Sequence, residues 1–212
     1  MTVPRADPAT RVLARYGPPL AWMGVIALLS GERFGADQTT PWLLPLLGRL
    51  LPWAGPDALH ALHILARRAA HLVEYGILAA LWLRALGPDH PPASAARWAV
   101  TLSALYALAD ELRQGLAPNR SPALLDVGID TAGAVLAAAA LRPGSPLGRR
   151  LPDLGAWVAG LLAASSLAAA GVDWSLGLPA WDLLLGAAGA AVAAWGLRTR
   201  GRPRPRATDG GP

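Results

Sequence analysis

The sequence predicts an all-α, polytopic membrane protein: a helix bundle with about six transmembrane helices and with both termini in the cytoplasm. Three observations support this fold class. Of the 212 residues, 53% are hydrophobic and only 16% are charged, whereas an average soluble domain carries roughly 25% charged residues. The apolar residues gather in six blocks, of which one approaches the length of about 20 residues that a helix needs to cross a bilayer, and five reach it only with a few polar residues at one end. Arginine is distributed unequally between the segments that join these blocks.

Six apolar blocks define the predicted spans. The charge-free run from Leu154 to Val172 approaches a full bilayer crossing by itself. The other five blocks become long enough when a few polar residues at one end are included. The predicted spans are residues 14–31, 68–86, 95–112, 124–141, 154–172 and 179–197. A soluble helical bundle is the alternative, but it requires a charged face on each helix, and the second half of this chain offers none.

Arginine sets the predicted orientation, because cells retain arginine-rich loops on the cytoplasmic side. All 19 basic residues are arginine. With the N-terminus inside, thirteen of them fall in cytoplasmic segments and six in outer segments. The outer six are Arg33, Arg49, Arg67, Arg68, Arg113 and Arg120. The formal net charge of +5 is therefore mostly a topology signal, and we expect membrane lipids as partners and no nucleic acid.

Three further segments are predicted to lie on the cytoplasmic side. Residues 1–13 form an N-terminal tail, residues 142–153 a loop, and residues 198–212 a disordered basic tail. The last segment combines Arg, Pro and Gly, which cannot bury a core, and its arginines are expected to lie on anionic headgroups. No cleavable signal peptide is evident, so the first helix is expected to remain as an anchor. The C-terminal pair of spans, within residues 154–197, is rich in Gly and Ala, which permits close helix packing.

The segment of residues 32–66 is predicted to lie at the outer membrane interface. Its stretch from Trp42 to Trp53 is too short, and too often interrupted by proline, to span a bilayer. Tryptophan is typical of the headgroup level. Pro56 followed by Asp57 then predicts a helix start, and this helix can continue into the second span.

The polar residues of the predicted spans gather at one side of the membrane. An ionisable group near the centre of a span costs about 2.5 to 3.5 kcal/mol on insertion scales. Here such groups lie at the start of the second span, the end of the third and the start of the fourth. These three ends face the same, outer side because successive helices alternate in direction. Together with a loop arginine, the polar cluster comprises Arg68, His71, Glu74, Tyr75, Asp110, Glu111, Gln114, Arg120, Asp126 and Asp130, with Gly133 as a structural position on the last stripe.

Two interpretations of this polar cluster are open. In the structural interpretation, Arg68 and Arg120 neutralise the acids and hold three helix ends together, while acids in a first helical turn suit the helix dipole. In the functional interpretation, the cluster is a site. We favour the second for the cluster as a whole, because a purely structural bundle could replace buried ion pairs by apolar side chains without loss of stability.

One group of residues has the spacing of a metal site. Asp57, His60 and His63 are spaced three residues apart and so share one helix face. Such a set without an acidic group behind it is more typical of interfacial residues than of a metal site. We expect neither a metal nor a cofactor.

The polar pattern resembles the VanZ-like family of bacterial membrane proteins. The matching motifs are Arg68-x-x-His71-x-x-x-Tyr75, Asp110-Glu111-x-x-Gln114, Arg120, and Asp126-x-x-x-Asp130-Thr131-x-Gly133. The resemblance covers about residues 14–141. It implies a multi-pass protein of the bacterial cytoplasmic membrane whose named relative is tied to low-level resistance to the glycopeptide teicoplanin, and it implies no particular reaction. The family more commonly has Lys at the first motif position, and often Asn at the position of Asp130.

The preferred functional hypothesis is a non-enzymatic envelope protein. Its outer-facing cluster would bind a polar headgroup, a cell-wall precursor or a lipoglycopeptide, and so support teicoplanin-type resistance or envelope homeostasis. Arg68 and Arg120 would contact anionic groups, and His71 and Tyr75 would donate or accept hydrogen bonds. The acids would orient the arginines or accept bonds from amino groups and hydroxyls.

Two alternatives remain open at the level of sequence. One is a membrane-embedded hydrolase or transferase acting on a lipid-linked substrate, with His71, Glu111 or Asp130 as catalytic group. In that case Asp126, Asp130 and Glu111 could hold a divalent cation through oxygen ligands. The other alternative is a proton-coupled carrier that titrates Glu74 and Asp130, although its acids would be expected near the midplane.

Overall fold

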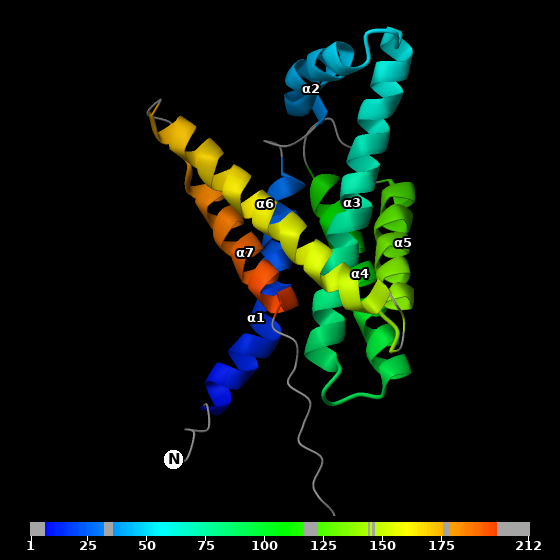
Figure 1. Cartoon of the computed structure of the whole chain (residues 1–212), viewed down its shortest axis with the longest axis vertical. Helices are drawn as coiled ribbons and strands as arrows, with labels where there is room; N and C mark the ends of the chain where they lie inside the picture. Colours follow the sequence, from blue (N-terminus) through cyan, green and yellow to red (C-terminus); the bar gives the residue numbers. More distant parts are fainter. Residues whose placement is uncertain are drawn as a thin grey trace, which may run out of the picture.

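The computed structural model describes residues 7–31, 36–116, 123–143, 145, 147–175 and 179–198. The regular secondary structure of these residues is α-helical (Figure 1), which confirms the predicted all-α class. The helices are α1 (Pro8–Leu29), α2 (Ala36–Leu50), α3 (Pro56–Leu86), α4 (Pro92–Gln114), α5 (Leu124–Ala140), α6 (Leu147–Ser175) and α7 (Trp181–Arg198). The predicted basic tail lies, from residue 199 on, outside the described residues.

Each predicted span has a helix at its position, with different bounds at several ends. The first helix begins at Pro8 rather than at residue 14, because proline suits the first turn, where its missing N–H needs no partner. The sixth helix begins at Leu147, inside the segment expected to be a loop. Residues 8–13 and 147–153 are therefore helical.

Two of the helices are long and apolar enough to cross a membrane by length and composition. They are α1 and α3, and a shorter apolar stretch, Gly155–Ala164, lies within α6. This criterion applies to the described part of the chain only, and it does not establish the predicted count of six spans. That count stays a prediction.

The outer segment of the sequence folds as one helix followed by the first half of another. Residues Ala36–Leu50 form α2 in spite of Pro41 and Pro45 inside it. Gly55 is the N-cap of α3 and Pro56 is its first residue, so the predicted helix start is confirmed. At about 1.5 Å per residue, the 31 residues of α3 measure about 47 Å, more than the roughly 30 Å of a bilayer core. Its first turns therefore project past the bundle, beside α2 (Figure 1).

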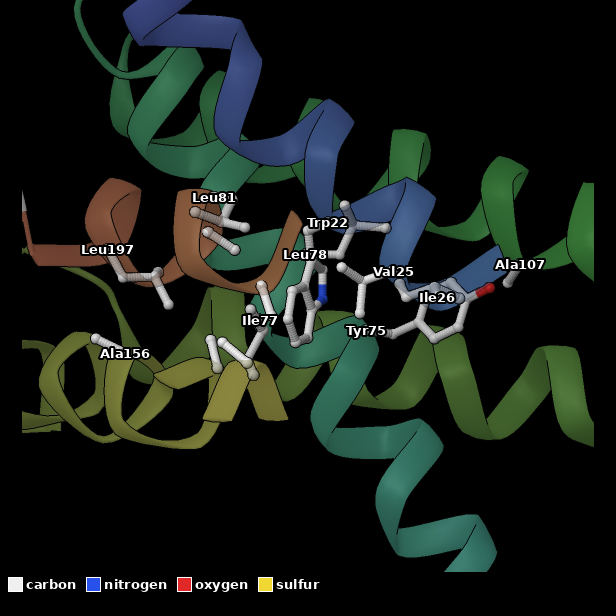
Figure 2. Close-up of a cluster of buried hydrophobic side chains, with 14 residues drawn as sticks. Trp22, Val25, Ile26, Tyr75, Ile77, Leu78, Leu81, Ala107, Ala156 and Leu197 are labelled. Carbon is white, nitrogen blue, oxygen red and sulfur yellow. The ribbon is translucent and has the colours of Figure 1, made fainter. Parts of the chain in front are cut away.

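A core of apolar side chains joins α1, α3, α6 and α7. Trp22 and Ile26 of α1 and Leu78 and Leu81 of α3 are fully buried, and alanines of the C-terminal helices fill the space between them (Figure 2). The indole Nε1 of Trp22 donates a hydrogen bond of 2.8 Å to the carbonyl of Glu74. This bond satisfies a polar atom that would otherwise be costly to bury.

Close backbone contact fixes how α3 and α5 cross. A Cβ atom at Gly133 would lie 2.2 Å from the carbonyl oxygen of Leu72, a separation that no side chain could tolerate. A Cβ atom at Gly76, one turn further along α3, would lie 3.5 Å from the carbonyl oxygen of Gly133. Small residues thus let the two helices touch, which places the middle of α5 directly beside the middle of α3.

The C-terminal helices complete the bundle by packing on α1. Helices α6 and α7 lie side by side, and α7 contacts α1 (Figure 1). A Cβ atom at Gly189 would lie 2.7 Å from a methyl of Val25, and one at Gly196 would lie 2.5 Å from Cβ of Pro18. The expected Gly- and Ala-based packing of this pair therefore includes contacts with the first helix.

Candidate functional site

A polar pocket of about 270 Å³ lies where α2, α3, α4 and α5 meet. It is lined by Thr40, His60, His63, Ile64, Arg67, Arg68, His71, Glu111, Gln114, Asp126, Ile129 and Asp130. Helix α3 supplies the basic side chains, while the end of α4 and the start of α5 supply the acids. Six of the predicted site residues line this pocket, so the structure brings together most of the polar cluster.

His71 and Asp130 join α3 to α5 across the pocket. The imidazole Nδ1 lies 3.4 Å from the carboxylate Oδ1, and the side chains are 26% and 6% exposed, respectively. The geometry of this contact falls short of a hydrogen bond, and the two groups form an ion pair when the imidazole is protonated. Asp130 is one turn before Gly133, so the close crossing of the two helices brings this carboxylate to the imidazole. The buried carboxylate of Asp130 therefore lies next to the imidazole of His71, which lines the pocket.

Asp110 has a different environment from the acids of the pocket. Its Oδ1 accepts hydrogen bonds from Nε and Nη2 of Arg113 at 3.2 and 2.8 Å, and its Oδ2 accepts one from Nε2 of Gln114 at 2.8 Å. Arg113 also donates to the carbonyl of Ala27 at 3.1 Å. Asp110 is only 3% exposed and is not among the residues that line the pocket. It holds the guanidinium of Arg113, which in turn links the end of α4 to the end of α1.

Glu111 both lines the pocket and caps a helix. Its Oε1 accepts a hydrogen bond of 2.7 Å from the backbone N–H of Ala123, the N-cap residue of α5. The first N–H groups of a helix have no partner within the helix, so this carboxylate supplies one. Glu111 therefore connects the C-terminal end of α4 to the N-terminal end of α5.

Glu74 and Tyr75 lie deeper than the pocket. Glu74 lines a smaller cavity of about 140 Å³ together with Leu29, Arg67, Ala70 and His71. Tyr75 is fully buried in the apolar core (Figure 2). Within the described part of the chain, its hydroxyl has no hydrogen-bond partner, and its ring faces that of Tyr106 at 6.3 Å between centroids. The structure does not place Tyr75 among the residues that a ligand in the pocket would touch.

Arg120 is a predicted site residue that lies outside the described residues. The cluster's other arginine, Arg68, is exposed at the rim of the pocket. The proximity of Arg120 to the acids therefore stays a prediction.

Sequence reasoning missed two polar residues of the pocket and undervalued two others. The sequence places Arg67 only among the arginines of an outer segment, and Thr40 carries no motif. His60 and His63 stand out only as a weak metal site. In the structure they line the pocket, and Nδ1 of His63 lies 3.4 Å from Oγ1 of Thr40. The sequence contains one signal that could have indicated His63 and Arg67. These residues and His71 are spaced four residues apart, so the three side chains lie along one helix face.

The described residues contain no group of three His, Cys, Asp or Glu side chains arranged to hold a metal ion. Neither set considered from sequence forms such a group: not Asp57, His60 and His63, and not Asp126, Asp130 and Glu111. The pocket instead combines three histidines and two arginines with three carboxylates. Such a lining can contact anionic groups and can also accept hydrogen bonds from amines and hydroxyls.

Comparison with known proteins agrees with the polar pattern. The VanZ/LLP1 family model matches residues 20–143, a range that runs from the second half of α1 to just beyond α5. It includes every predicted site residue and excludes α6 and α7. No curated protein and no solved structure matches the chain.

Proposed function

The chain belongs to the VanZ/LLP1 family, and from this premise we propose a multi-pass protein of the bacterial cytoplasmic membrane that binds a polar headgroup at its outer face. Helix α1 and helices α3 to α7 are the six proposed spans, and both termini are cytoplasmic. The distribution of arginine supports this orientation. In this orientation the polar pocket opens to the outer leaflet, with α2 lying over it at the interface.

The observation that carries the proposed binding function is the lining of the pocket. Basic groups of α3, such as Arg67 and Arg68, face acids of α4 and α5, such as Glu111 and Asp126. A lipid headgroup, a cell-wall precursor and a lipoglycopeptide all combine anionic groups with hydroxyls or amines. Guanidinium groups donate hydrogen bonds to anionic groups, and carboxylates accept hydrogen bonds from hydroxyls and amines.

Direct binding of headgroup analogues to purified full-length protein tests this proposal. The double variant Arg68→Ala with His71→Ala removes two side chains of the pocket, and we expect it to weaken binding at least tenfold. Arg49→Ala is the matched control, because Arg49 is an exposed arginine of α2 that does not line the pocket. Equal binding by the double variant and the wild type would overturn the proposal.

A role in teicoplanin resistance is tested in cells. Asp130→Ala and His71→Ala are compared for the amount of protein in the membrane and for teicoplanin sensitivity. Normal protein with altered sensitivity supports a binding role in resistance. Normal protein with unaltered sensitivity would assign the pocket to envelope homeostasis without resistance.

One observation favours a second candidate, a hydrolase or transferase for a lipid-linked substrate. The carboxylate of Asp130 faces Nδ1 of His71, and a carboxylate in that position orients an imidazole as a general base. Incubation of purified protein with a lipid phosphate then gives a released product that His71→Ala abolishes. Absence of turnover by the wild-type protein would remove this candidate and leave binding.

A further inference from the structure

We propose that the end of the bundle opposite the polar pocket holds an anionic phospholipid, with its phosphate among three arginines and one acyl chain in a groove that α3 and α5 form with α6 and α7. This lipid site is formed by residues that do not line the polar pocket. The proposal does not depend on which ligand the polar pocket binds.

The basic part of the site is a cavity of about 890 Å³ between α3, α4 and α5. Arg84 comes from the last turn of α3, Arg97 from the second turn of α4, and Arg142 lies two residues after the end of α5. His90 lies in the connection between α3 and α4. None of the described residues that line the cavity is acidic. The neighbouring Asp89 is paired with Arg15, at 2.6 Å between Nη2 and Oδ2.

An apolar groove of about 330 Å³ adjoins this cavity, since Ala80 and Leu141 line both. The groove continues along α3 as far as Leu72 and along α5 as far as Gly133. Eight residues of helix separate its ends, which corresponds to about 12 Å. The wall opposite is formed by Gly155, Val158 and Leu197 of α6 and α7, and every residue that lines the groove is apolar. Its length accommodates roughly the first ten carbons of an acyl chain.

A phospholipid accounts for both parts together. Retention of arginine in cytoplasmic segments explains basic loops, but it does not require that arginines of three elements surround one concavity. Basic pockets between transmembrane helices on the cytoplasmic side bind the headgroups of anionic lipids. A guanidinium matches the geometry of a phosphate by donating two parallel N–H bonds, and the adjoining groove offers the acyl chain an apolar surface.

Lipid binding to the purified full-length protein, measured by native mass spectrometry with phosphatidylglycerol and phosphatidylcholine, tests the basic part. Arg97→Gln with Arg142→Gln changes two exposed side chains of the cavity. At about 1 kcal/mol for each arginine, we expect phosphatidylglycerol to bind about 30-fold more weakly. Phosphatidylcholine is expected to bind weakly to all forms.

The matched control is Arg11→Gln with Arg198→Gln. Both arginines are exposed, Arg11 near the start of α1 and Arg198 at the end of α7, and neither lines the cavity or the groove. This control loses the same charge and is expected to bind phosphatidylglycerol within about twofold of the wild type. An equal loss in both double variants would show attraction by net charge alone and would overturn the proposal.

The groove is tested by Ala140→Phe, which places a ring among the groove residues. We expect at least a fivefold loss of affinity for phosphatidylglycerol with long chains and no change for its short-chain form. Glycerol phosphate, used as a competitor, separates a lipid from a free phosphate. Competition by glycerol phosphate as strong as that of the lipid, or an unchanged affinity of Ala140→Phe for the long-chain lipid, would overturn the acyl-chain assignment.

Discussion

The imidazole of His71 on α3 and the carboxylate of Asp130 on α5 meet at 3.4 Å, in the wall of a pocket that four helices form. The pair is positioned by backbone packing one turn away, where α5 touches the carbonyl of Leu72. The geometry of the pair therefore depends on how the two helices cross.

Because His71 and Asp130 interact, we expect the effects of replacing them on the free energy of unfolding to be non-additive. His71→Ala leaves the buried carboxylate of Asp130 without the imidazole that faces it, and it is expected to lower the melting temperature more than Asp130→Ala. The two changes together are expected to lower it by less than the sum of the single effects, with a coupling of about 0.5 to 1 kcal/mol. Thermal unfolding of all four forms in one detergent measures this. Asp130→Ala combined with Arg49→Ala is the control, and it is expected to be additive.

Gly133→Ala is expected to destabilise the bundle, because the new Cβ would overlap the carbonyl of Leu72. Overpacking of this kind costs about 1 to 3 kcal/mol. Gly128→Ala is the matched control in the same helix, since a Cβ there meets nothing within 4 Å and alanine favours a helix. We expect a melting temperature several degrees lower for the first variant and unchanged or higher for the second. Equal melting temperatures would contradict the observed crossing.

Gly196→Ala is expected to loosen the C-terminal helices from α1. Its Cβ would lie 2.5 Å from Cβ of Pro18 and 3.2 Å from a methyl of Leu81. We expect faster proteolysis in the connection between α5 and α6, together with a lower melting temperature. Gly160→Ala on α6, where a Cβ meets nothing within 4 Å, is expected to behave as the wild type. Identical proteolysis of both variants would argue against close packing of α7 on α1.

Two substitutions of Glu111 distinguish its role as a helix cap from a role in ligand binding. Glu111→Gln retains an oxygen that can accept the bond from the N–H of Ala123, so its melting temperature is expected to stay close to that of the wild type. Glu111→Ala leaves that N–H without its partner and is expected to cost about 1 kcal/mol. Ligand binding measured on the Gln variant then reports the charge alone. A melting temperature equally reduced in both variants would contradict the capping role.

Arg113→Ala is expected to destabilise the protein, because Asp110 is buried and would keep only its bond from Gln114. The link from α4 to the carbonyl of Ala27 would also be lost. We expect a loss of about 1 kcal/mol, since the guanidinium itself is 45% exposed. Arg68→Ala, which removes an exposed arginine at the rim of the pocket, is expected to leave the melting temperature unchanged. For headgroup binding we expect the opposite ranking, in which Arg68→Ala binds more weakly than Arg113→Ala.

Much of the fold could be predicted because its signals are local. Runs of apolar residues indicate the positions of the helices, and proline at a first turn marks the start of α3 at Pro56. The least predictable element is α2, which remains helical with Pro41 and Pro45 inside it. Contact with α3 provides packing that intrinsic helix preference does not include.

The sequence by itself determined that this chain is helical and that it belongs with the VanZ/LLP1 family, and it predicted that the polar groups gather at one end of three helices, because spacing along a helix fixes depth. Only the tertiary structure decided which of these groups face the pocket. His71 and Tyr75 differ by four residues, so they lie about 40° apart around α3 and one turn apart along it. That difference leaves one beside Asp130 and the other in the apolar core. Which side of α3 faces the pocket is set by the contact of Gly133 with Leu72, two positions that no local pattern relates.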